Sequence, residues 1–150
     1  MHCSIHPTIV SNILDHFLRR PQGENTVVGT LLGGVDGQLV DIQTCFSVPF
    51  EKEEKEGFVL DKDYLHKMLK FHRKVNPKED LVGLYVSGDK IDATILALFN
   101  YYQQLSKEKK NKSPLQGQPL MLMIDPTMKN NKLSIKVCSS LSKNCYCLGA

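Results

Sequence analysis

The sequence lacks any apolar run near the ~20 residues that a membrane-spanning helix needs, so no spanning helix is expected. Its five cysteines are odd in number and irregularly spaced, which argues against a disulfide framework and fits a reducing compartment. The N-terminus has neither a charged n-region nor a long apolar h-region, so no secretory signal is expected. The net charge of +3 is too small to predict nucleic-acid binding, and its basic segment "KEKKNK" (107–112) is interpreted as a solvated loop, with a phosphate-contacting patch as the alternative.

The second half of the chain also lacks histidine, because all five histidines lie at or before His72. Nucleophilic catalysis needs a serine or cysteine beside a histidine base. Ser87 follows an apolar run, but in the context V-S-G-D rather than G-x-S-x-G, so we interpret it as a turn-stabilising residue. Asp89 and Asp92 are interpreted as turn and N-cap residues, and "GTLLGG" has no P-loop lysine and no helix after it.

Cysteine does not predict a metal site either. Cys145 and Cys147 are separated by one residue instead of the two to four of a zinc knuckle, and no second pair follows them. His2, Cys3 and His6 lie close together at the N-terminus but have no fourth ligand.

We expect one globular domain, since the chain has 150 residues and 41% of them are apolar. Three segments have the apolar spacing of amphipathic helices. The first covers 7–18, the second begins after Asp61 or Asp63 and ends at Asn76, and the third covers 92–105. The stripe expected to face the core on the first helix consists of Ile9, Val10, Ile13, Leu14, Phe17 and Leu18. The residues expected on one side of the second helix are Tyr64, Leu65, Met68, Leu69, His72 and Val75. The core stripe expected on the third helix consists of Ile95, Leu96, Leu98, Phe99 and Tyr102.

A β-hairpin is predicted between the first two helices. Residues 26–34 are β-branched and 39–50 alternate between apolar and polar, while Asp36-Gly37 is a strong hairpin-turn signal. The first strand reads as buried on both faces. Gly29 interrupts it, where the missing Cβ allows another element to approach closely.

The remaining strands are predicted at 79–87, 120–126 and 132–140, and the charged segment "EKEEKEG" (51–57) is interpreted as a solvated loop. The C-terminal segment "LSKNCYCLGA" shows no clear pattern. The resulting order of elements predicts one mixed sheet with helices packed on it, an α/β layer arrangement.

Several segments resemble the MPN (JAMM-type) family in the order that the family has them: "HPTIVSNILDHFLRR", "VVGTLLGG", "CFSVPF" and "LSIKVCSS". The resemblance is closest to the non-catalytic branch, and within it to the F-type subunits of eukaryotic translation initiation factor three, through "VNPKEDLVGLYVSG", the pair Tyr101-Tyr102 and "IDPTMKNNKLSIKV". The non-catalytic MPN subunit of the proteasome lid is second, through "FSVPFEKEEKE" and "LDKDYLHKM". The resemblance implies a single MPN/JAMM-like α/β domain with a mixed, mostly antiparallel sheet flanked by three helices.

Catalytic members of the family hold zinc through two His and one Asp, and a Glu takes the proton of the metal-bound water. The resemblance places the Glu position at Thr26 and the His positions at Val86 and Gly88. It places the Asp position at Leu98 or Phe99. Apolar side chains offer a metal no lone pair, and Thr is no general base. The resemblance therefore implies a domain that is not an enzyme and that binds no metal or other cofactor.

A domain that keeps this fold without the metal is expected to act as a scaffold subunit of cytoplasmic translation initiation factor three. The resemblance implies a heterodimer with a second MPN-domain subunit, contacts with other subunits of the complex, indirect association with the small ribosomal subunit and no membrane partner. The alternatives are a subunit of the proteasome lid and an isopeptidase or deubiquitinase with an atypical metal site. Because family members continue into further strands and long C-terminal helices, we expect residues 1–150 to be an MPN core fragment.

The first and second helices are the expected docking faces, with Met68 as first choice because an exposed methionine adapts to a partner pocket. The alternative for all these residues is ordinary core packing, and a homodimer through the same faces is an option for the isolated domain. The candidate partner-binding residues are Leu65, Met68, Leu69, His72, Leu14 and Phe17.

Overall fold

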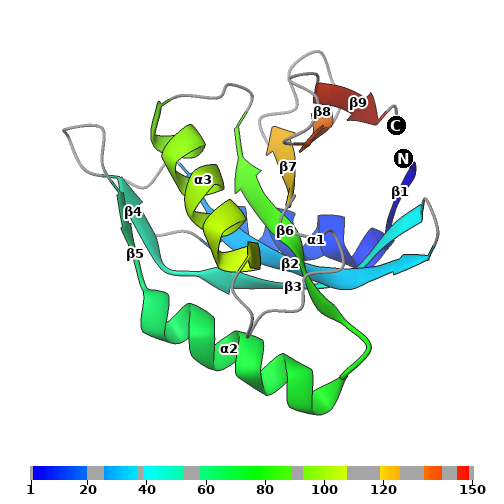
Figure 1. Cartoon of the computed structure of the whole chain (residues 1–150). Helices are drawn as coiled ribbons and strands as arrows, with labels where there is room; N and C mark the ends of the chain where they lie inside the picture. The colour runs from blue at the N-terminus through cyan, green and yellow to red at the C-terminus, as the bar shows by residue number, and fades with distance from the viewer. Residues whose placement is uncertain are drawn as a thin grey trace.

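A curved mixed sheet forms the centre of the domain in the computed structural model, with helices packed on it (Figure 1). The structure describes residues 2–19, 26–36, 39–52, 58–88, 93–107, 119–125, 134–139 and 145–148. Its elements in chain order are β1 (His2–Ile5), α1 (Pro7–Leu18), β2 (Val28–Asp36), β3 (Leu39–Val48), β4 (Phe50–Lys52), β5 (Phe58–Leu60), α2 (Lys62–Val75), β6 (Asp80–Ser87), α3 (Ala93–Lys107), β7 (Leu120–Asp125), β8 (Ser134–Ser139) and β9 (Cys145–Leu148). None of these helices is long and apolar enough to cross a membrane.

Seven of the strands form the main sheet, in the order β1-β3-β2-β6-β7-β8-β9. Only β1–β3 and β6–β7 are parallel pairs, and α3 is the crossover between β6 and β7. The predicted fold class, an α/β MPN domain with a mostly antiparallel sheet and three helices, is confirmed. The sequence prediction missed β1, β9 and the small β4–β5 hairpin. The interpretation of 51–57 as entirely loop is wrong at its start, where β4 continues to Lys52.

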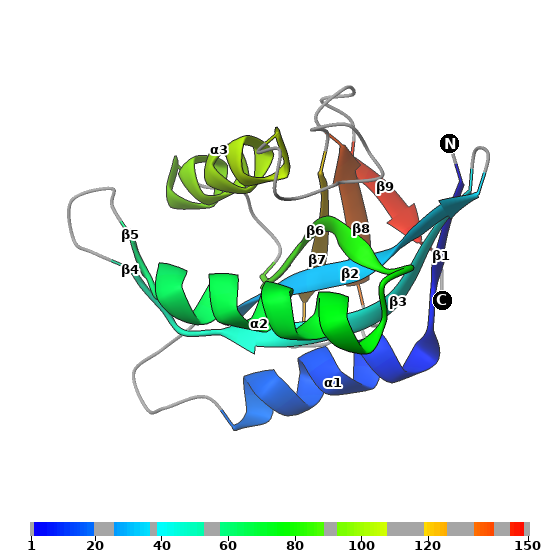
Figure 2. The same ribbon diagram turned by 60° about the horizontal axis from the view of Figure 1, so that its bottom comes forward.

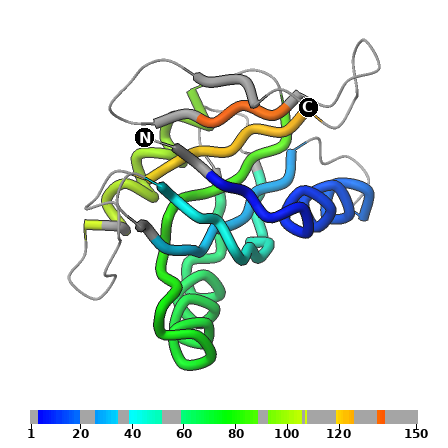
Figure 3. The backbone as a smooth tube through the Cα atoms, turned by 90° about the vertical axis from the view of Figure 1, so that its right-hand side faces the viewer, coloured from blue at the N-terminus to red at the C-terminus, as the bar shows by residue number. Residues whose placement is uncertain are grey.

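Two apolar cores lie on the two faces of the sheet, because its central strands are buried on both sides. Val28 and Leu32 of β2 point to the core shared with α2 and α3, whereas Leu31 points to the core shared with α1. Figure 3 shows α1 and α3 on opposite sides of the sheet. Gly29 meets the prediction made for it, since a Cβ there would collide with the Tyr85 ring on β6.

The helix ends follow local signals in the sequence. Asp61 caps α2 by accepting a hydrogen bond from the Tyr64 N–H at 3.0 Å, and α2 ends before Asn76, as predicted. Three residues of the predicted stripes are wrong: Leu18 ends α1 at 79% exposure, Val75 ends α2 at 67%, and Leu96 on α3 is 52% exposed. All three lie on the outer face because the buried side of each helix is narrower than the predicted stripe.

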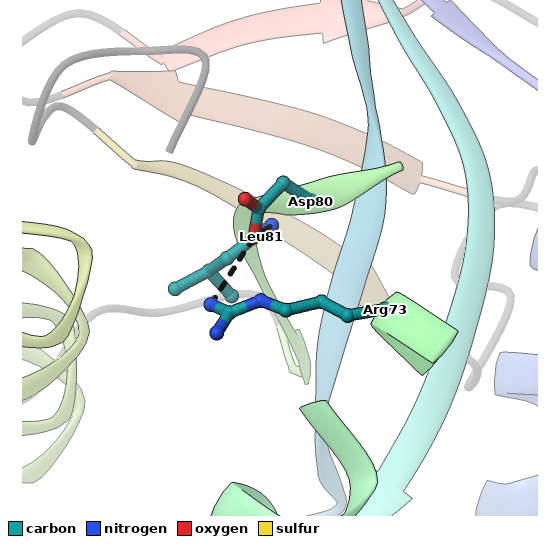
Figure 4. A network of polar contacts seen from close by, with 3 residues as sticks. All are labelled: Arg73, Asp80 and Leu81. Atoms are coloured by element: carbon teal, nitrogen blue, oxygen red, sulfur yellow. Dashed lines mark hydrogen bonds and ion pairs between the residues drawn. The ribbon is translucent and has the colours of Figure 1, made fainter. Parts of the chain in front are cut away.

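An ion pair joins the end of α2 to the start of β6 (Figure 4). The Arg73 guanidinium lies 3.4 Å from Asp80 Oδ1, which also accepts a hydrogen bond from the Leu81 N–H at 2.8 Å. The same carboxylate therefore sets the direction of the chain as it turns from the helix into the sheet.

Candidate functional site

The positions that the resemblance assigns to a zinc site converge where β2 begins and β6 ends. Because the two strands are antiparallel, with Val28 opposite Val86, these ends lie at the same edge of the sheet. The Val27 N–H donates to Ser87 Oγ at 2.9 Å, and the Ser87 N–H donates to the Val27 carbonyl at 3.0 Å. Ser87 is buried and stabilises the turn, as the sequence predicts.

The structure brings three of the five assigned positions into one apolar cluster. Val86 and Leu98 are fully buried in the core between the sheet and α3, and the half-buried Phe99 packs against the same core. Thr26 is half-buried at the strand edge. Gly88 follows β6 with a φ of +138°, and its N–H donates to the Ile124 carbonyl at 2.8 Å.

This set of residues does not fit a zinc ion. Zinc in proteins takes thiolate, imidazole or carboxylate ligands, and the cluster offers hydrocarbon side chains instead. The Thr26 hydroxyl, at the position assigned to the general base, is neutral at physiological pH. Over the ranges that the structure describes, no three His, Cys, Asp or Glu residues are grouped so as to hold a metal. Asp89, Asp92, residues 108–112 and the side chains of His2, Cys3, Cys145 and Cys147 lie outside those ranges.

An open cleft of about 610 Å³ lies beside this strand edge. Thr26 lines it together with His16 of α1, Asp61 and Tyr64 at the start of α2, and the β4–β5 hairpin. Its histidine, His16, and its two carboxylate residues, Glu51 and Asp61, come from three separate elements.

A smaller cavity of about 300 Å³ shares His16 with the cleft and is lined by Cys45 and Tyr85 among others. Tyr85 OH and His16 Nδ1 are hydrogen-bonded at 2.9 Å. Burial raises the pKa of Cys45, although a hydrogen bond from Asn12 opposes the shift, and burial also raises the pKa of Tyr85. Both groups therefore keep their protons at neutral pH, and the cavity does not activate Cys45 as a nucleophile.

The candidate partner-binding residues divide into core and surface groups. Leu65 and Leu69 are buried in the core of this chain, which is the alternative considered for them, so they do not reach a partner surface. Met68 is half-buried, and His72 is half-buried and stacks on Phe46 with ring centroids 5.3 Å apart.

On α1, Leu14 and Phe17 are half-buried and pack at the margin of the second core. The sequence reasoning missed two more exposed apolar side chains on α2, Phe71 at 58% and Val75 at 67% exposure, as possible contacts. The sequence feature that could have indicated them is an aromatic residue on the lysine-rich side of the helix, followed by a valine in its last turn.

Comparison with known proteins identifies the family. The sequence model of the family described as JAB1/Mov34/MPN/PAD-1 ubiquitin protease matches residues 1–108. The chain is 33% identical over 131 residues to the F subunit of eukaryotic translation initiation factor 3 of Dictyostelium discoideum, and the match covers 87% of the chain and 43% of that relative. It is 37% identical over 142 residues to the corresponding F subunit of Arabidopsis thaliana, and the match covers 92% of the chain and 44% of that relative.

The chain thus spans less than half the length of these curated relatives. The resemblance to the MPN family and to the F-type subunits of the initiation factor is confirmed by these matches. With the sheet topology and three helices described above, they show that this chain belongs to the JAB1/Mov34/MPN/PAD-1 family.

Proposed function

We propose that this chain is the MPN core of a translation initiation factor three subunit and that it acts there as a non-catalytic scaffold in the cytoplasm. The observation that carries the proposal is the apolar cluster of Val86, Leu98 and Phe99, which occupies positions assigned to metal ligands in catalytic members. Thr26 and Gly88 at the two other positions supply no general base and no ligand side chain. The names of the relatives supply the choice of complex.

A scaffold of this kind functions through its surfaces. We expect a heterodimer with a second MPN-domain subunit, contacts with further subunits, and through them an indirect link to the small ribosomal subunit. The exposed apolar side chains that support docking are Phe71 and Val75 on α2, beside the half-buried Met68, and Leu18 on α1, beside the half-buried Phe17. Phe71 and Val75 are four residues apart on one helix, and exposed apolar side chains grouped in this way favour a partner surface over single scattered exposure.

Purification of the natural protein, tagged at its own locus, tests the choice of complex. Mass spectrometry of the purified assembly should find initiation factor three subunits together with small-subunit ribosomal proteins. An assembly composed of proteasome-lid subunits would refute the initiation factor and support the lid.

Metal analysis and a cleavage assay test the scaffold against the isopeptidase alternative. The purified chain should retain far less than one zinc per molecule after gel filtration and should leave ubiquitin chains intact. A zinc-dependent MPN peptidase treated in parallel is the positive control. Stoichiometric zinc with chelator-sensitive cleavage would require the domain to be treated as a hydrolase.

A further inference from the structure

The outward side of α2 carries a stripe of lysines. Lys67, Lys70 and Lys74 are all exposed, and their i, i+3, i+7 spacing places them on one face of the helix. Asp63, in the first turn, is the only acidic residue within α2. Figure 1 shows α2 along the lower margin of the molecule, and in Figure 2, where the bottom comes forward, α2 lies in front with no described helix or strand over it.

An apolar stripe runs beside the lysines with the same spacing. It consists of Met68, Phe71 and Val75, of which Phe71 and Val75 are mostly exposed. Burying these two side chains against a partner would remove apolar surface from water without rearranging the core, because Leu65 and Leu69 on the opposite side already anchor the helix.

The lysine stripe differs from the other basic residues of α2, which have contacts within the chain. Arg73 forms the ion pair with Asp80, and Lys62 lies over the Tyr101 ring at 5.2 Å from its centroid. Over the described part of the chain, no ion pair is formed by Lys67, Lys70 or Lys74.

We propose that the outer face of α2 docks a partner protein whose contact surface carries an acidic strip beside an apolar strip. This inference rests on the proposed function, since it specifies the chemistry of the partner on one of the scaffold's docking helices. Acidic groups would lie opposite Lys67, Lys70 and Lys74, and the apolar strip would cover Phe71 and Val75. Complementary charge fixes the register of such a contact and suppresses wrong partners.

The same arrangement disfavours a second copy of this chain as the occupant. In a two-fold contact centred on the two stripes, antiparallel helices would place lysines against lysines. Parallel helices would instead place the lysines of each copy against the apolar stripe of the other. Both pairings bury charge without a counter-charge, so this face selects against the homodimer considered for the isolated domain.

Nucleic acid is a poorer occupant than an acidic protein. A phosphate backbone would satisfy the lysines but would leave Phe71 and Val75 against polar sugar and phosphate groups. The chain also carries a net charge of only +3, which is small for a surface that binds phosphate chains.

A charge-reversed copy of the chain is a defined probe for the proposed surface. Lys67→Glu, Lys70→Glu and Lys74→Glu in one copy create the acidic strip beside an apolar strip, and an antiparallel contact with the native chain then satisfies both stripes. In sedimentation equilibrium at low salt, the mixture should associate at least about tenfold more tightly than either chain does with itself. The gain should shrink at 500 mM salt, because exposed ion pairs are screened.

Two further variants separate charge from apolar contact. Adding Phe71→Ser and Val75→Ser to the charge-reversed copy should abolish the gain, and replacing the three lysines by Gln instead of Glu should remove most of it. All variants should unfold at the temperature of the native chain, since every substituted side chain is exposed. Absence of a gain in the mixture, or a gain that survives the serine substitutions, would overturn the proposal.

The natural assembly and an RNA probe complete the test. When the tagged protein carries the three Lys→Glu substitutions in α2, much less of the MPN-domain partner should co-purify with it at moderate salt. The three Lys→Gln substitutions should reduce the co-purified partner less. Recovery of the initiation factor assembly with unchanged partner binding would overturn this inference and leave the proposed function standing. A 20-nucleotide single-stranded RNA that binds the native chain but not the glutamine variant would reassign the surface to nucleic acid.

Discussion

A buried hydrogen bond between β2 and α3 allows a quantitative test of how the sheet and the crossover helix are held together. Thr30 Oγ1 and Tyr102 OH lie 2.8 Å apart, and neither residue is accessible to solvent. Removing one of the two hydroxyls leaves the other in an apolar core with no water to replace its partner. Such a loss costs roughly 1–3 kcal/mol of unfolding free energy.

The double variant distinguishes a real pair from two independent core residues. Tyr102→Phe and Thr30→Val should each destabilise the domain by roughly 1–3 kcal/mol, because each leaves one buried hydroxyl without its partner. Tyr102→Phe with Thr30→Val removes both hydroxyls at once and keeps nearly the same shape. Its cost should be smaller than the sum of the single costs by at least about 1 kcal/mol.

Urea unfolding of the four proteins, followed by far-UV circular dichroism, measures this coupling. Thr44→Val is the matched control: Thr44 Oγ1 donates to Glu79 Oε2 at 2.9 Å at a half-buried site, where water can replace the bond. That control should cost less than about 1 kcal/mol. Additive single costs, or a Tyr102→Phe variant as stable as the native chain, would refute the reasoning.

Three further outcomes follow from the packing. Gly29→Ala should lower the thermal midpoint by several degrees, because the added Cβ would collide with the Tyr85 ring. Gly34→Ala in the same strand should have little effect, because the nearest atom is 3.9 Å from the added Cβ, and equal effects would contradict the steric argument. Ser87→Ala should lower the free energy of unfolding in urea by roughly 1–3 kcal/mol, because the buried N–H of Val27, just before β2, loses its acceptor. A cost near zero would contradict this. Burial raises the pKa of Tyr102, so the hydroxyl loses its proton at lower pH in the unfolded chain than in the folded one. The contribution of this group to the free energy of unfolding should be fully present below pH ~10 and should fall as pH rises above it. Tyr102→Phe should therefore flatten the fall in urea midpoints measured from pH ~8 to pH ~11.

The elements predictable from the sequence are those with local signals strong enough to decide them. Asp61 caps α2 and Asn76 follows its last residue, so both ends of that helix can be read from a few neighbouring letters. The missed strands are short, and pairing with distant segments decides whether they form. β1 is a strand because four residues lie parallel to β3, and β9 because four residues pair with β8. Neither segment has an alternating pattern long enough to predict this.

The candidate docking surface on α2 also depends on contacts with distant segments, which the sequence alone does not show. Helical spacing indicates that α2 has apolar residues on more than one side, but it does not say which side meets the sheet. Leu65 and Leu69 occupy that side, and Phe71 was not selected because it departs from the main stripe. The clustering of Val86 with Leu98 was anticipated only through the family resemblance, since nothing local in the sequence relates a strand end to a residue on the next helix.

The end of β6 has a backbone conformation that favours glycine at one of the positions that the resemblance assigns to a metal ligand. Gly88 has a φ of +138°, a conformation that side chains with a Cβ rarely adopt, although no atom lies within 4 Å of where that Cβ would be. A histidine at this position would therefore be strained by its own backbone and not by its neighbours. The turn is also held by the Gly88 N–H bond to Ile124 and by the exchange of hydrogen bonds between Ser87 and Val27. A histidine placed at this position would therefore have to adopt the strained backbone conformation or break hydrogen bonds that hold the turn.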